Sequence, residues 1–224
     1  MTREGRSLQR EEAQRGAQRR GAELRRHILA IAKDVFLEAG YERTSMDAVA
    51  ARAGTSKRSL YAHFESKQKL FDAVLDFVRE LYLGKLSTPD AYADDPTEAI
   101  SLFCGRFQQL MTWEPQVRLC RLCIAEAERL PGSASAYFDA MFVKAYDRLA
   151  SYLYERYRAH GIDRAAATSL AQDLLGRTVL PRLLRALLGV ESAIKGSDSP
   201  SEKDIAADVD IATIRATVST VLRL

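Results

Sequence analysis

Four side chains between residues 57 and 63 carry chemistry suited to an anionic partner. Lys57 and Arg58 are cationic and stand in the first turn of a predicted short helix, and Tyr61 and His63 follow with polar tips. Cations in this place suit guanine O6 and N7 in the major groove of DNA, or phosphate oxygens if the angle is wrong for bases. A charged helix face is also typical of a solvated helical hairpin whose cations only aid solubility. The local signals around these residues decide between the two interpretations.

Two short helices joined by a tight turn would hold these side chains in place. The first helix, capped by Thr44 or Ser45, ends at Gly54, because glycine adopts a left-handed conformation at a helix C-terminus without steric cost. Ser56 follows as the N-cap of the second helix, accepting a hydrogen bond from a backbone N–H. Two helices joined by a short glycine turn form a helix-turn-helix, which we predict over about residues 45–64.

Apolar residues at helical spacing supply the buried faces of the motif and of the helices beside it. Leu60 and Phe64 lie at i and i+4 of the second helix and are expected to be buried. A preceding helix over about residues 22–39 and a following helix capped by Ser66 complete a three-helix head. The other expected core residues of the head are Ile28, Ile31, Ala32, Val35, Phe36, Ala39, Val49, Ala53, Leu70, Phe71 and Val74.

The segment from Thr44 to Lys69 closely resembles the DNA-binding domain of tetracycline-repressor-type (TetR) transcriptional regulators. The residues that carry the resemblance are Tyr61, Phe64 and Lys67, together with Phe36, Ala39, Gly40 and Tyr41 at the end of the preceding helix. The resemblance extends from near Ala22 to near Leu81. It implies an all-helical homodimer whose divergent C-terminal domain usually binds a small inducer.

DNA contacts are predicted at the motif and on the helices that flank it. The predicted DNA-binding residues are Thr44, Ser45, Thr55, Ser56, Lys57, Arg58, Tyr61, His63 and Lys67. Arg58 is assigned to a base edge, and Tyr61 and Lys67 are assigned to phosphates. Lys67 lies in the first turn of the helix capped by Ser66, where the positive end of a helix already favours an anion.

Composition and charge agree with a DNA-binding head on a regulatory body. Residues 1–70 carry 15 Lys or Arg and 9 Asp or Glu, whereas residues 71–224 carry 18 Lys or Arg and 21 Asp or Glu. No apolar run approaches the ~20 residues of a membrane span, and no signal peptide is expected. Three cysteines fit a reducing cytoplasm. We predict a basic flexible arm over 1–21, a head over 22–82, and a helical ligand-binding and dimerisation domain over 83–224.

The C-terminal part is predicted to consist of further helices, so the expected fold class is all-α. The segment 195–203 is expected to be a polar loop. The expected helices cover about 96–112; Pro115 to near Leu130, where Pro131-Gly132-Ser133 breaks the pattern; a long helix to near Gly161; Asp163 to about 188 with a kink or break at Pro181; and about Asp204 to 222.

The helices over about 164–188 and 204–222 match, in the resemblance, those that form the dimer interface of the family as a four-helix bundle. Ile214 and Val218 are predicted to lie at that interface. A two-fold dimer presents two equivalent recognition helices, so the operator is expected to be an inverted repeat. The stretch RLCIAEAERLP, over 121–131, resembles the subgroup with an AefR-like C-terminal domain.

The predicted function is a ligand-responsive, DNA-binding transcriptional regulator, a repressor that a small inducer releases from a palindromic operator, and two alternatives remain. Cys120 and Cys123 lie at i and i+3, with Cys104 on the preceding helix, so a thiol-based redox sensor is conceivable, although buried cysteines are ordinary core residues. A helical enzyme or small-molecule carrier with an incidental helix-turn-helix is the other alternative. We expect no catalytic residues, metal or cofactor, since zinc would need about four ligands. Aromatic residues suggest a small, largely apolar inducer, but sequence does not separate pocket wall from core, so no ligand contacts are predicted.

Overall fold

The computed structural model describes residues 3–196 and 200–222, which form two compact units, Met1–Phe77 and Val78–Leu224. Helix α4 (Lys67–Leu83) continues across this division, which falls just before the boundary expected at residue 82. Within the described ranges there is no β-strand, only an isolated parallel bridge between Trp113 and Ile194. The all-α prediction is confirmed. No helix in the described ranges combines the length and the apolar character required to cross a bilayer.

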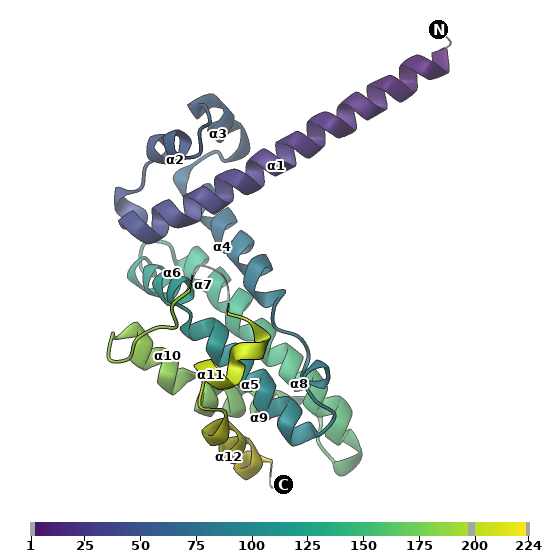
Figure 1. Ribbon diagram of the computed structural model, residues 1–224, viewed down its shortest axis with the longest axis vertical. Coiled ribbons are helices and arrows are strands. Elements are labelled where there is room, and N and C mark those ends of the chain that lie inside the picture. The colour runs from purple at the N-terminus through teal and green to yellow at the C-terminus, as the bar shows by residue number, and fades with distance from the viewer. Residues whose placement is uncertain (1–2, 197–199, 223–224) are drawn as a thin grey trace. The chain divides into compact units, whose positions relative to one another are not determined.

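The N-terminal unit contains α1 (Arg3–Arg43), α2 (Met46–Arg52), α3 (Lys57–His63) and the start of α4 (Figure 1). α1 begins at Arg3 rather than near residue 22, so the segment expected as a basic flexible arm is helical from Arg3 onwards. This segment is rich in Arg, Glu, Gln and Ala, which favour helix, and extending an existing helix needs no new nucleation. Arg19 and Glu23 form an i, i+4 ion pair at 3.2 Å on the same helix.

Three aromatic rings form the centre of the N-terminal core. Phe36 stacks on Tyr41 with 5.9 Å between ring centroids, and Phe71 meets both rings edge-on at 5.1 and 5.2 Å. Leu60 and Phe64 are buried against this core, as are the other predicted positions except the half-buried Ile31 and Ala39, so the expected inward faces are confirmed. α3 is therefore held by apolar packing on one side only.

Glycines and capping residues end and start the helices of the head as the sequence predicts. Gly40 (φ 80°) kinks α1 three residues before its end, and Gly54 (φ 62°) adopts the left-handed conformation after α2. Ser56 Oγ accepts a backbone N–H of α3 at 3.1 Å, and Ser66 Oγ accepts one of α4 at 3.2 Å. Of the two candidate caps before α2, Ser45 accepts the backbone hydrogen bond, at 3.1 Å.

The C-terminal unit is built around α5 (Pro96–Thr112), which packs against α6, α9, α10, α11 and α12 (Figure 1). Close approach at Gly105 shows how tight this packing is: a Cβ there would lie 3.0 Å from Ile211 Cδ1 and 3.1 Å from Ile205 Cγ2. The remaining helices are α6 (Glu114–Ala125), α7 (Pro131–Phe138), α8 (Lys144–Tyr157), α9 (Arg164–Thr178), α10 (Leu180–Leu187), α11 (Ile205–Asp208) and α12 (Ile211–Val221).

Prolines account for one confirmed and one corrected helix boundary. The break predicted at Pro181 is confirmed: α9 ends at Thr178 and α10 starts two residues later, because proline lacks an N–H and crowds the preceding turn. Pro131 was expected to end a helix, but it occupies the first turn of α7, a position that needs no N–H donor. α6 ends earlier than predicted, at Ala125.

Two predicted long helices are divided in the structure. A π-helical turn, Asp139–Val143, separates α7 from α8. The last helix, expected from about Asp204, is divided into α11 and α12 by Val209, whose backbone is extended. Asp210 then caps α12 through its carboxylate, which accepts the Thr213 N–H at 3.1 Å. The apolar pattern alone did not reveal that Asp210 would cap a new helix instead of continuing the preceding one.

Candidate nucleic-acid interface and effector cavity

The solvent-facing side of α3 carries the predicted recognition residues. Lys57 and Arg58 are exposed in its first turn, and Tyr61 is 49% exposed. Across the part of the chain that the structure describes, the Arg58 side chain has neither a hydrogen bond nor an ion pair. His63 is half-buried, with its ring 6.2 Å from that of Phe64. Arg58 is thus available for an external anion or base, whereas His63 is less so.

Ion pairs orient α2 and α3, and the sequence did not predict them. Lys57 Nζ lies 2.5 Å from Asp47 Oδ2 at the start of α2. Arg52 near the end of α2 forms a two-pronged pair with Glu38 of α1, with Nη2 at 2.8 Å from Oε1. All four side chains are substantially exposed, so the stabilisation is modest. The Lys57–Asp47 pair joins the first turn of α3 to α2, and the Arg52–Glu38 pair joins α2 to α1.

The remaining predicted contacts around the turn differ in their accessibility. Ser45 and Ser56 are exposed and cap α2 and α3, and Thr55 is half-buried. Thr44 is only 3% exposed, and its hydroxyl donates to the Gly40 carbonyl at 2.7 Å. The structure therefore gives Thr44 an internal role at the turn after α1, and we no longer assign its hydroxyl to DNA.

Lys67 also turns inward instead of towards a phosphate. Its ammonium donates to the carbonyls of Tyr41 at 2.9 Å and Glu42 at 3.2 Å, and it lies 4.4 Å from the centroid of the Tyr41 ring. These carbonyls lie in the last turn of α1, so the cation interacts with the negative end of the helix dipole. Lys67 therefore joins α4 to the end of α1.

We expect Lys67→Ala to destabilise the head by about 1–3 kcal/mol, because two charge-assisted hydrogen bonds and a cation–π contact are lost. Chemical denaturation followed by far-UV circular dichroism would measure the change. Lys69→Ala removes an exposed cation from the same helix and is expected to change stability by less than about 0.5 kcal/mol. A Lys67 variant of wild-type stability whose DNA affinity depends less steeply on salt would restore the phosphate assignment.

An apolar cavity of about 650 Å³ opens in the C-terminal unit. Among the described residues, no charged side chain contributes to its wall. Several rim residues, including Ile124, Phe138 and Leu184, are exposed. The wall is made by Cys120, Cys123, Ile124, Ala127, Ala134, Tyr137, Phe138, Phe142, Tyr146, Gly176, Leu180, Pro181, Leu183, Leu184 and Leu187. Its size and apolar lining are typical of small-molecule sites.

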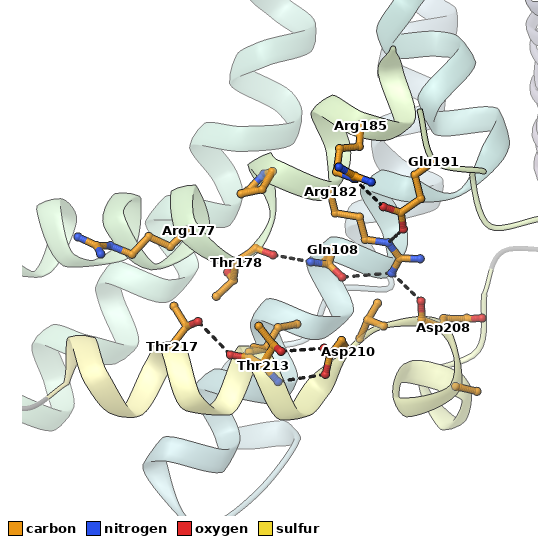
Figure 2. A pocket seen from close by; sticks show the side chains of 14 residues that line it. Gln108, Arg177, Thr178, Arg182, Arg185, Glu191, Asp208, Asp210, Thr213 and Thr217 are labelled. Carbon is orange, nitrogen blue, oxygen red and sulfur yellow. Dashed lines mark hydrogen bonds and ion pairs between the residues drawn. The ribbon is translucent and has the colours of Figure 1, made fainter. Parts of the chain in front are cut away.

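A second cavity, of about 760 Å³, is polar, and its groups mostly pair with one another (Figure 2). Arg182 donates to Glu191 Oε1 at 2.9 Å, to Gln108 Oε1 at 3.2 Å and to the Asp208 carbonyl at 2.6 Å. Gln108 also donates to the Thr178 carbonyl (Figure 2). This network joins α5, α9, α10 and α11, so we interpret it as structural, and the apolar cavity is the better effector site.

The three cysteines are core residues in the structure. Cys104, Cys120 and Cys123 are all free and buried. Burial raises the pKa of Cys104 and of Cys123 to about 12, and it also raises the pKa of Cys120. Because the thiolate is the reactive form, protonated buried thiols are poorly suited to redox sensing, and the redox alternative loses support.

Two family models match the chain. Residues 28–74 match the model described as bacterial regulatory proteins of the tetR family, and residues 98–215 match the AefR-like transcriptional repressor C-terminal domain. The subgroup resemblance is thereby confirmed.

Known relatives match over part of their length. The HTH-type transcriptional activator FasR of Mycolicibacterium smegmatis is 46% identical over 65 residues, which are 27% of this chain and 30% of that protein. The HTH-type transcriptional regulator RutR of Escherichia coli is 36% identical over 120 residues, which are 50% of this chain and 55% of that protein. The chain therefore matches about half or less of the length of these relatives.

Solved structures match over most of their length. The flavonoid-responsive regulator FrrA superposes with a TM-score of 0.70 at 28% identity, covering 90% of this chain and 96% of that one. A TetR-family transcriptional regulator from Mesorhizobium loti has a TM-score of 0.72 at 25% identity, with 91% and 96% covered. Because the C-terminal family model alone matches more than half of the 224 residues, and the head matches its own model, the chain belongs to the TetR family of bacterial regulatory proteins.

Proposed function

We propose that this chain is a homodimeric, ligand-responsive transcriptional repressor that binds an inverted-repeat operator and is released by a small, largely apolar inducer. The observation that carries the DNA-binding part is the exposed first turn of α3, where Arg58 is unpaired within the described residues and Lys57 is oriented by Asp47. The family matches over 28–74 and 98–215 support the division into a DNA-binding head and a regulatory domain.

The contacts that we propose follow from the exposure of each side chain. Arg58 reads a base edge from the N-terminal turn of α3, since its guanidinium can bond guanine O6 and N7 together. Tyr61, further along the exposed side, donates its hydroxyl to a phosphate. Contacts to the DNA backbone around these two residues remain proposed for Ser45, Thr55, Ser56, Lys57 and His63.

Inducer action requires a molecule that binds one conformation of the dimer better than another. A ligand with higher affinity for the conformation that does not fit the operator shifts the population away from DNA. The apolar cavity of the C-terminal unit supports a largely apolar effector, and the flavonoid response in the name of FrrA points in the same direction. The names of relatives include an activator and repressors, so repression is itself part of the proposal.

Replacing Arg58 with alanine tests the DNA-binding proposal. Binding to an inverted repeat selected in vitro with the wild-type protein is expected to weaken by about 1–3 kcal/mol, while affinity for scrambled DNA changes far less. Gel-shift titrations at fixed salt would measure both affinities. Arg58→Lys is the matched control: it keeps the charge but loses the two-pronged geometry, so it should also lose discrimination. An unchanged ratio of specific to nonspecific affinity in both variants would remove Arg58 from base recognition.

A further inference from the structure

A polar node interrupts the apolar cavity wall, to which Tyr146 contributes a second phenol. The node is built from side chains on two helices. The Tyr137 hydroxyl, on α7, accepts a hydrogen bond from Gln116 Nε2, on α6, at 2.7 Å. Cys120, one turn after Gln116 on α6, contributes its thiol to the same part of the wall. Tyr137 and Cys120 belong to the cavity wall, and Gln116 is fully buried behind them. The phenol is thus fixed from behind and borders the cavity.

We propose that this cavity binds a neutral, aromatic molecule carrying a carbonyl or hydroxyl oxygen, and that Tyr137 donates its phenol proton to that oxygen. This inference rests on the proposed function, because the molecule would be the inducer. The inducer would then be a neutral aromatic molecule, and Tyr137 would select for its oxygen.

Among the described residues, no oxygen or nitrogen accepts the phenol proton of Tyr137. Gln116 donates to the phenol oxygen, so the hydroxyl hydrogen points away from Gln116. A carbonyl or hydroxyl oxygen accepts hydrogen bonds well. A ligand oxygen placed at this point therefore forms a hydrogen bond that those residues do not supply, while Gln116 keeps the phenol in position.

The wall excludes charged ligands and favours flat aromatic ones. With no charged lining residue, an ionised carboxylate or amine would lose its hydration without an opposite charge to replace it. Phe138 and Phe142 present stacked rings with centroids 5.3 Å apart, at an angle of 21°. A planar ring system can lie against such faces. The volume of about 650 Å³ accommodates a molecule of two or three fused rings.

The binding site can be tested with prodan, a neutral naphthalene ketone whose emission shifts to the blue in apolar surroundings. We expect saturable binding at one site per protomer. Gly176 lies in the wall, and a Cβ added there meets no atom within 4 Å, so Gly176→Leu should extend into open space at the cavity and reduce prodan affinity at least about tenfold. Gly176→Ala is the matched control and should retain binding.

The chemical class can be tested by displacing prodan with three naphthalenes of similar size. We expect 2-acetylnaphthalene to bind about five- to tenfold more tightly than 2-ethylnaphthalene, and the 2-naphthoate anion to bind least tightly. Tyr137→Phe should lower the affinity for the acetyl compound to that for the ethyl compound while leaving the latter unchanged. Thermal melting would confirm that the Tyr137→Phe variant is folded. If the variant does not fold, the order of the three affinities in the wild-type protein still tests the chemical class of the ligand.

Three results would overturn the inference. The first is an absence of prodan binding to the folded wild-type dimer, which is also the result expected if a second copy of the chain fills the cavity. The second is a wild-type preference for 2-naphthoate or 2-ethylnaphthalene. The third is an acetyl preference that survives in Tyr137→Phe. Each leaves the proposed function standing if the inverted repeat is still protected, whereas a chain that binds prodan but protects no DNA site contradicts the proposed function instead.

Discussion

Leu188→Arg is expected to convert the proposed dimer into monomers and to weaken binding to the inverted repeat by at least about 100-fold. Leu188 directly follows α10 as its C-cap and is 71% exposed, and Val190 is 63% exposed. Large apolar side chains exposed together are typical of a protein–protein contact. Two arginines facing each other near a two-fold axis would repel and would lose hydration in the contact.

DNA affinity should fall with the dimer because a single recognition helix reads too few base pairs to select a site. A two-fold dimer places two such helices about 34–36 Å apart, or a multiple of that, on one face of B-DNA. Light scattering and footprinting on the same samples would follow both properties. Ala159→Arg adds the same charge at an exposed position outside α10 and should change neither. A monomeric Leu188 variant that protects the whole inverted repeat with wild-type affinity would refute the dimer argument.

Val218→Arg is expected to destabilise the C-terminal unit by about 3–5 kcal/mol, because it buries a charge without a partner. Val218 is 0% exposed and Ile214 is 3% exposed, both inside a single protomer, where α12 packs on α5 and α9. The prediction that these two residues lie at the dimer interface is therefore wrong. Arginine at either position should unfold this unit and should not merely separate two folded copies.

Urea denaturation monitored by circular dichroism would measure the loss. Ala216→Arg, on the exposed side of the same helix, supplies the control and is expected to stay within about 0.5 kcal/mol of the wild type. A Val218 variant that melts like the wild type but is monomeric would return this residue to the interface.

Local signals in the sequence were enough to predict the helix-turn-helix. Ser56 as a cap, Gly54 as a left-handed stop and the Leu60/Phe64 pair all involve residues within a few positions of one another. Each such signal acts through one helical turn, so its outcome depends little on the rest of the chain. The exposure of Arg58 follows directly from the burial of the opposite face of the same helix.

Local patterns did not reveal side-chain partners that lie far away in sequence. Lys67 was assigned to phosphate from its place in the first turn of a helix, but its acceptors are carbonyls 25 and 26 residues earlier. Apolar periodicity identified Val218 as a buried position without indicating whether the covering surface belongs to the same chain. The division of the last helix at Val209 likewise depends on Asp210 and on the tight packing against Gly105.

The amino-acid sequence by itself determined the all-α fold class, the helix-turn-helix and its exposed cations, because helix caps, glycine stops and helical periodicity are properties of short segments. Only the tertiary structure decided which aromatic residues line a cavity and which fill the core. Tyr137 and Gln116 lie 21 positions apart, and their hydrogen bond exists only because α6 and α7 pack together. A binding site assembled from several helices depends on that packing, and no pattern within one segment contains it.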